Sequence, residues 1–183
     1  MAHLKLENFS ISPLSQEIFD KTQKALGFVP NMYKTMGANP ALLDAYIYAY
    51  TSFRANSGFN SVEQEVVFLS VAYENNCEYC MAAHSFIGDK MSKVPTEVTD
   101  AIREDKQIPD AKLAALSKLT RSLTVTRGNV SQAEVDAFLA AGYLELHVLG
   151  ILAGIAVKTM SNYSNHITNP ELDAAFAGRA WKK

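Results

Sequence analysis

Apolar side chains recur at intervals of three and four residues along nearly every long segment of this chain. This spacing places them on one face of an α-helix. One such stripe consists of Leu42, Leu43, Tyr46, Ile47, Tyr50 and Phe53. No segment of strand length alternates apolar and polar residues, and the turn signals are typical of helix caps rather than of hairpins. Because 183 residues suit one domain, we expect a single all-α domain over residues 1–183.

Capping residues mark where the expected helices begin. Asn39 precedes one helix, and Ser61 is the expected N-cap of the next, with Gln64 completing a capping box. Ser131 caps a later helix. With the apolar pattern, these signals predict helices over residues 16–25, 40–56, 61–74, 77–90, 95–104, 111–126, 131–142, 144–165 and 171–177. Residues 27–31 are expected to form a loop.

The composition argues against several classes of function. With 48% hydrophobic and 20% charged residues, the chain is globular rather than disordered. Its 17 Lys and Arg residues are scattered, so no electrostatic footprint for nucleic acid is visible. The longest apolar region, residues 143–160, contains Glu145, His147 and Lys158 and is typical of a buried core helix rather than a membrane span. Because the first residues lack an apolar stretch long enough for a signal peptide, we expect a cytoplasmic protein that binds neither nucleic acid nor a membrane.

The two cysteines, Cys77 and Cys80, are the feature that points to chemistry. They are three residues apart, and a disulfide that closes so small a loop removes little chain entropy. In a protein with no export signal, such a pair indicates metal binding or redox chemistry rather than a structural disulfide.

A base and a carboxylate accompany the pair. Cys80 and His84 are four residues apart and share one face of the expected helix over residues 77–90. The free N–H groups at the start of that helix would stabilise a thiolate. Glu65, on the preceding helix, would reach His84 if the two helices pack antiparallel, and it would then hold the imidazole in one tautomer. A thiolate beside a base is what attack on a peroxide or a disulfide requires.

The pattern Glu65-x11-Cys77-x2-Cys80-x3-His84 resembles the signature of the AhpD-like alkylhydroperoxidases, within the wider carboxymuconolactone decarboxylase superfamily. Residues 26–32 and 158–166 resemble segments of the peroxidase-related branch of that superfamily. The resemblance implies an AhpD-like helical bundle that assembles into dimers, trimers or hexamers through its apolar helices.

The resemblance also implies thiol peroxidase chemistry on an organic hydroperoxide or hydrogen peroxide, with no cofactor beyond the dithiol. Cys80 is then the nucleophile, which the peroxide oxidises to a sulfenic acid. Cys77 resolves that acid as a disulfide, and an external dithiol or a thioredoxin-like partner reduces the disulfide. His84 and Glu65 relay the proton.

One position departs from the family pattern. Characterised alkylhydroperoxidases carry a histidine immediately before the nucleophilic cysteine, and this chain has Tyr79 there. A tyrosine, with a pKa near 10, is a poor base at neutral pH, so Tyr79 is at most a supporting residue.

Two other interpretations of the pair stay open. One is a redox-sensing or disulfide-exchange protein of the same fold without significant peroxidase turnover. The other is a metal-binding structural domain, in which Cys-x-x-Cys supplies half of a tetrahedral zinc site and His84 with His147 or His166 completes it.

Overall fold

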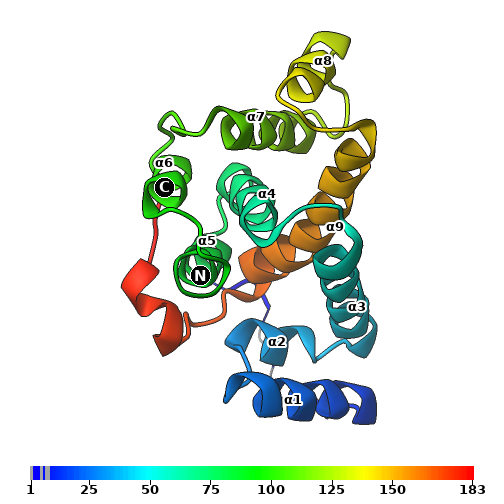
Figure 1. Cartoon of the computed structure of the whole chain (residues 1–183). Helices are drawn as coiled ribbons and strands as arrows, with labels where there is room; N and C mark the ends of the chain where they lie inside the picture. Colours follow the sequence, from blue (N-terminus) through cyan, green and yellow to red (C-terminus); the bar gives the residue numbers. More distant parts are fainter. Residues whose placement is uncertain (1, 5, 7–8) are drawn as a thin grey trace.

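The structure, a computed structural model, describes residues 2–4, 6 and 9–183 (Figure 1). Its α-helices are α1 (Pro13–Leu26), α2 (Asn31–Met36), α3 (Pro40–Asn56), α4 (Ser61–Glu74), α5 (Glu78–Ile87), α6 (Thr96–Arg103), α7 (Ala111–Val125), α8 (Gln132–Ala140) and α9 (Glu145–Thr168). A π-helical turn over Gly88–Ser92 extends α5, and a 3₁₀ helix over Ala174–Arg179 lies near the C-terminus. No strand occurs within the described ranges, so the all-α prediction is confirmed.

Helix α4 forms the centre of the core and contacts α5, α7 and α9, which surround it in Figure 1. It is apolar around most of its circumference, which is typical of a helix buried on all sides. Val66, Val67, Phe68 and Leu69 are fully buried, and so is Glu65 beside them. A carboxylate at the centre of the core needs partners, because a buried unpaired charge is costly.

Helix α9 is the longest helix, at 24 residues, and it packs against α3 and α4. Glycines allow this close approach: an added Cβ would lie 2.6 Å from the Ser57 carbonyl oxygen at Gly150, and 2.6 Å from Val67 Cγ1 at Gly154. Neither α9 nor any other single helix of the described chain is long and apolar enough to cross a membrane, although α8 and α9, bent by 110°, pass that test as a pair.

The capping box of α4 lies one residue earlier than we expected. Asn60, not Ser61, is the N-cap: its Oδ1 accepts from the Glu63 N–H at 3.0 Å, and Glu63 Oε2 accepts from the Asn60 N–H at 3.0 Å. Gln64 is not part of the capping box, and its side-chain amide instead donates to the carbonyl of Phe59 at 2.8 Å. The expected cap at Ser131 is confirmed, with Glu134 completing its box.

Two other expectations about helices are wrong. The loop expected over residues 27–31 ends one residue earlier, because Asn31 begins the short helix α2, which is too brief to carry a periodic apolar pattern. The helix expected over residues 171–177 is instead an extended segment followed by the 3₁₀ helix. Asp173 has an extended backbone, so a helix cannot run through it, and its carboxylate accepts from the Asn31 N–H at 3.2 Å at the start of α2 rather than capping the 3₁₀ helix.

The turn between α4 and α5 sets the geometry of the site. Asn76 adopts a left-handed conformation, with φ of 52°, which asparagine tolerates better than most residues. The Cys77 N–H then donates to the Ala72 carbonyl at 2.9 Å, and Cys77 becomes the N-cap of α5. The chain therefore reverses within a few residues, and α5 packs back along α4.

Candidate functional site

Glu65 on α4 and His84 on α5 meet in the core. His84 Nδ1 lies 2.9 Å from Glu65 Oε2, and both side chains are buried. Burial lowers the pKa of His84 below its usual value of 6.5, the charge of Lys158 lowers it further, and Glu65 opposes both. The imidazole is therefore neutral at pH 7 and donates from Nδ1 to the carboxylate, which leaves Nε2 as a proton acceptor.

The second oxygen of Glu65 binds Arg54 of α3. Arg54 Nη2 lies 2.5 Å from Glu65 Oε1, and Ser92 Oγ donates to the same oxygen at 3.2 Å. Burial acts to raise the pKa of Glu65, but His84 and Arg54 outweigh it and hold that pKa below its usual value of 4.5. Because Arg54 balances the charge of the carboxylate, His84 can orient against Glu65 without becoming protonated.

The two thiols lie at the first turn of α5. Cys77 and Cys80 are both buried and free. One amide of α9 touches both, because Asn165 Nδ2 lies 3.6 Å from Cys77 Sγ and 3.3 Å from Cys80 Sγ. Cys80 Sγ also lies 3.8 Å from Ser161 Oγ. The sulfurs are therefore held close together against the same face of α9.

One of the two sulfurs is anionic at neutral pH. The Cys80 thiol, which donates toward the Cys77 sulfur, lowers the pKa of Cys77 to about 6, and Lys158 and Asn165 contribute, although burial opposes them. Burial raises the pKa of Cys80, and its donation toward Cys77 raises it further. The resting pair is thus a Cys77 thiolate beside a Cys80 thiol.

Tyr79 has a structural contact of its own. Its hydroxyl donates to the Asp173 carboxylate, and the Met32 N–H donates to the same hydroxyl at 3.4 Å. Burial and the hydrogen bond to Asp173 raise the pKa of Tyr79 above its usual value of 10. Tyr79 is therefore a neutral group that ties α5 to α2 and to the C-terminal segment.

Two cavities of different character lie beside α5, and Tyr79 lines both. One has a volume of about 500 Å³ and is mostly apolar; His84 lies in its wall, with Tyr33, Tyr46 and Phe176. The other has a volume of about 560 Å³ and is more polar, and Cys77 is in its wall. His84 and Cys77 thus face separate cavities.

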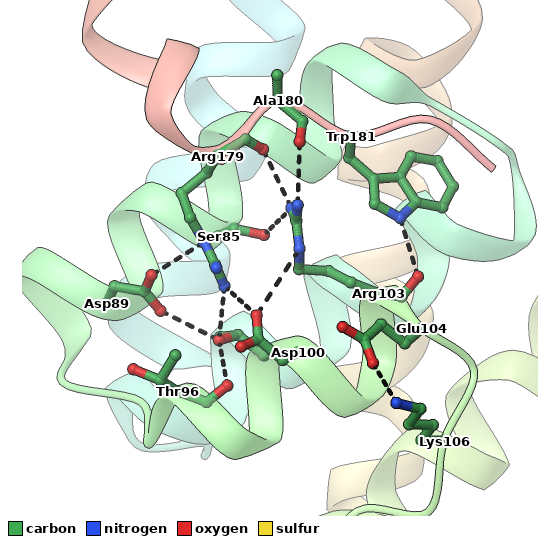
Figure 2. A network of polar contacts seen from close by, with 11 residues as sticks. Ser85, Asp89, Thr96, Asp100, Arg103, Glu104, Lys106, Arg179, Ala180 and Trp181 are labelled. Atoms are coloured by element: carbon green, nitrogen blue, oxygen red, sulfur yellow. Dashed lines mark hydrogen bonds and ion pairs between the residues drawn. The ribbon is translucent and has the colours of Figure 1, made fainter.

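The C-terminal segment closes one side of both cavities, with Phe176 in the wall of the apolar cavity and Trp181 in that of the polar one. Figure 2 shows how this segment is fastened to α6. Arg179 pairs with Asp100 at 2.7 Å, Arg103 donates to the Arg179 carbonyl at 3.1 Å, and Trp181 donates to the Arg103 carbonyl at 2.9 Å. Each of these contacts joins residues that are 76 to 79 positions apart in the sequence.

The structure pairs four of the five expected site residues: Glu65 contacts His84, and Cys77 and Cys80 contact one amide, with Cys80 and His84 about one turn apart on α5. Tyr79 lies beside them but points toward the C-terminal segment. Sequence reasoning missed several residues of the site, namely Arg54, Lys158, Ser161, Asn165 and Asp173. A signal existed for those on α9, because Lys158, Ser161, Asn162 and Asn165 recur at the spacing of one helix face, and the structure buries all four.

A metal site needs more ligands than this cluster offers. Among the residues that the structure describes, no group of three His, Cys, Asp or Glu side chains lies close enough to hold a metal ion. His147 stacks near Phe59 and Tyr143, and His166 lies in the wall of the polar cavity with Cys77 alone of the two cysteines. The zinc interpretation therefore lacks its third and fourth ligands.

Solved structures have the same arrangement of helices. An uncharacterized peroxidase-related protein from Silicibacter sp. TM1040 superposes with a TM-score of 0.82 at 20% identity, over 97% of this chain and 95% of its own. The alkylhydroperoxidase AhpD core of a peroxidase-related protein from Ralstonia eutropha JMP134 superposes with a TM-score of 0.80 at 21% identity, over 98% of this chain and 100% of its own. The chain has the AhpD-like fold.

The debrominase Bmp8 shares the AhpD-like fold, with a TM-score of 0.73 at 19% identity over 91% of this chain and 90% of its own. A cysteine-to-alanine variant of Bmp8 has been solved in complex with 2,3,4-tribromopyrrole, and it superposes with a TM-score of 0.77. No family model matches the chain, and no curated protein matches it.

Proposed function

We propose that this AhpD-like chain is a thiol-dependent peroxidase that uses the Cys77–Cys80 dithiol. The observation that carries the proposal is the cluster itself: two adjoining thiols with one negative charge, beside a histidine whose Nδ1 is fixed by Glu65. The apolar cavity at His84 favours an organic hydroperoxide over hydrogen peroxide, because only the former has an apolar body to bury there.

The oxidising half-reaction starts at Cys80, on the side of His84. Its sulfur bonds to the terminal oxygen of the hydroperoxide while the O–O bond breaks. The thiol proton passes to Nε2 of His84 and from there to the departing alkoxide, which leaves as an alcohol. Cys80 is then a sulfenic acid.

Cys77 is suited to the second step because it is already anionic. Its sulfur attacks the sulfenic sulfur of Cys80, a disulfide forms, and hydroxide leaves and takes up a proton to become water. An external dithiol or a thioredoxin-like protein reduces the disulfide. The polar cavity gives such a reductant a route to Cys77 that does not pass through the apolar cavity.

Serine variants test this assignment. In Cys80→Ser, peroxide consumption with an excess of dithiol is expected to fall to the background rate of a variant in which both cysteines are replaced by serine. Cys77→Ser is expected to react once and to keep a sulfenic acid that dimedone labels. Wild-type turnover in both single variants would overturn the proposal, and dimedone labelling of Cys80→Ser instead would contradict the roles given to the two cysteines.

A second candidate is reductive debromination of an aromatic compound. It is favoured by the aromatic wall of the apolar cavity, in which Tyr33, Tyr46 and Phe176 take part, together with the fold shared with Bmp8. In that reaction an aryl C–Br bond becomes C–H with the proton of the Cys80 thiol, the thiolate and the thiol become a disulfide, and bromide leaves. Bromide release from a bromopyrrole by the reduced protein would support it, and an unchanged thiol count would exclude it.

We also infer that the chain forms a homo-oligomer through α3 and the first half of α9. Tyr48 of α3 is 76% exposed, and Leu149 of α9 is 68% exposed with Leu146 beside it. Contiguous exposed apolar side chains of this kind mark interaction surfaces. Sedimentation should give a mass above the monomer, and a mass that changes with the redox state of the cysteines would favour a redox-sensing role.

A further inference from the structure

Lys158 is a buried charge that the proposed peroxidase reaction does not use. It lies in the middle of α9 and its side chain is fully buried. Among the described residues, its Nζ has no hydrogen-bond partner and no carboxylate within ion-pair distance. An ammonium group in such a place is costly unless something anionic faces it.

The neighbours of Lys158 identify that anion. Its Nζ lies 5.3 Å from the centre of the Phe68 ring, and that ring lies 4.9 Å from the imidazole of His84. Ser161 and Asn165, one and two turns further along the same face of α9, contact the sulfurs of the dithiol. Lys158 therefore stands on the helix face that adjoins the dithiol.

The carboxylate in this part of the core is not available to Lys158. Both oxygens of Glu65 are engaged, one by His84 and the other by Arg54 and Ser92. In the described part of the chain, the other group at this face of α9 that can carry negative charge is the dithiol. In agreement with this, the ammonium acts to lower the pKa of both Cys77 and Cys80, although burial still raises that of Cys80.

We propose that Lys158 is the permanent counter-charge of the Cys77–Cys80 pair, which stabilises whichever sulfur is anionic in the redox cycle. This inference rests on the proposed function only in taking the pair to be a redox dithiol. When an external thiolate attacks the disulfide, its sulfur bonds to one cysteine and the Cys77–Cys80 bond breaks. The other cysteine leaves as a thiolate beside the ammonium. The second thiolate of the external dithiol then displaces the first cysteine, so the external dithiol is oxidised and the pair is reduced.

The counter-charge has two measurable consequences. Loss of a neighbouring unit charge shifts a pKa by about one unit or more, so the lower thiol pKa of the pair rises by that amount without Lys158. The ammonium stabilises the thiolate and therefore the reduced state, so removing the ammonium shifts the equilibrium about tenfold toward the disulfide. For a two-electron couple, that corresponds to a potential more negative by about 30 mV.

Lys158→Met tests the proposal, because it removes the charge and nearly keeps the shape. Lys118→Met, at an exposed lysine of α7, is the matched control. The first readout is the ultraviolet absorbance of the thiolate against pH in the reduced protein, and the second is the equilibrium of the disulfide with a glutathione buffer. In Lys158→Met, the lower thiol pKa is expected to rise by about one unit or more, and the equilibrium is expected to shift about tenfold toward the disulfide. In Lys118→Met, both are expected to stay at wild-type values.

Unchanged values in a folded Lys158→Met protein would overturn the proposal. Wild-type protein tests it without a variant, because a lower thiol pKa at or above that of free cysteine, about 8.5, would also overturn it. Neither readout uses a peroxide. A protein that lacks peroxidase activity but has the Lys158-dependent pKa would therefore contradict the proposed function alone.

Discussion

Replacing Glu65 with glutamine removes one charge from the centre of the core and almost no volume. In the wild type, Glu65 joins His84 of α5 to Arg54 of α3, with both contacts in buried surroundings. Glutamine can still form hydrogen bonds to both side chains, but it offers no negative charge to either. The variant therefore separates the charge of this residue from its shape.

Two magnitudes follow from the structure. Removing one partner of a buried ion pair costs about 3–5 kcal/mol, and we expect the lower end, about 3 kcal/mol, because Arg54 keeps its hydrogen bonds to Tyr50 and Gln64. For a domain of this length that corresponds to a fall in Tm of about 6–12 °C. Without the carboxylate, the pKa of His84 falls further and its ring is held less firmly, so the rate with a hydroperoxide is expected to fall about 10- to 100-fold.

Urea denaturation gives the first quantity, and kcat/KM for an organic hydroperoxide, measured well below the Tm of the variant, gives the second. Glu17→Gln is the control, because Glu17 is exposed and forms a surface pair with Lys21, and its effect should stay within about 1 kcal/mol. A Glu65→Gln protein with the stability and the kcat/KM of the wild type would refute the reasoning.

Three other predictions concern the surroundings of the site. Tyr79→Phe removes the hydrogen bond to Asp173, so the free energy of unfolding should fall by about 1–3 kcal/mol in urea while the lower thiol pKa stays unchanged; a raised thiol pKa would mean that Tyr79 acts on the dithiol directly. Gly154→Ala brings a Cβ to 2.6 Å from Val67, so calorimetry should give a lower Tm for a loss of about 1–3 kcal/mol, and an unchanged Tm would show that α9 does not pack this closely. The pKa of His84 is lower in the folded protein than in the unfolded chain, so the unfolded chain binds more protons below pH 6.5. In Cys77→Ser, which removes the titration of the Cys77 thiol (pKa about 6 when folded), stability should be complete above pH 6.5 and fall as the pH drops through 6.5 toward the folded pKa of His84, and a flat profile from pH 7 to 5.5 would contradict a buried neutral imidazole.

The helices could be predicted from the sequence, and so could the grouping of Glu65, His84 and the two cysteines, because both depend on local spacing. Cys77 is the N-cap of α5. Glu65 lies nine residues before the end of α4 and His84 six residues after the start of α5, so antiparallel packing of the two helices brings them together. The error at Ser61 also has a local cause. Asn60 and Ser61 are both good caps, and the carboxylate of Glu63 decides in favour of the former.

The residues that were missed depend on contacts between distant segments. Arg54 reaches Glu65 only because α3 packs beside α4, and no spacing pattern joins those positions. Asp173 is 94 residues from Tyr79 in sequence. The polar residues of α9 were visible in the sequence, but the part of the core that Lys158 and Asn165 face became known only from the packed helices.

The central claim is that Cys77 and Cys80 act as one reactive dithiol. Its most direct test is a titration of the reduced protein with one equivalent of an organic hydroperoxide, in which free thiols are counted and the intact mass is followed with time. We expect rapid loss of both thiols and a mass lower by two hydrogen atoms, as a Cys77–Cys80 disulfide requires. Thiols that persist for minutes at an unchanged mass would contradict it.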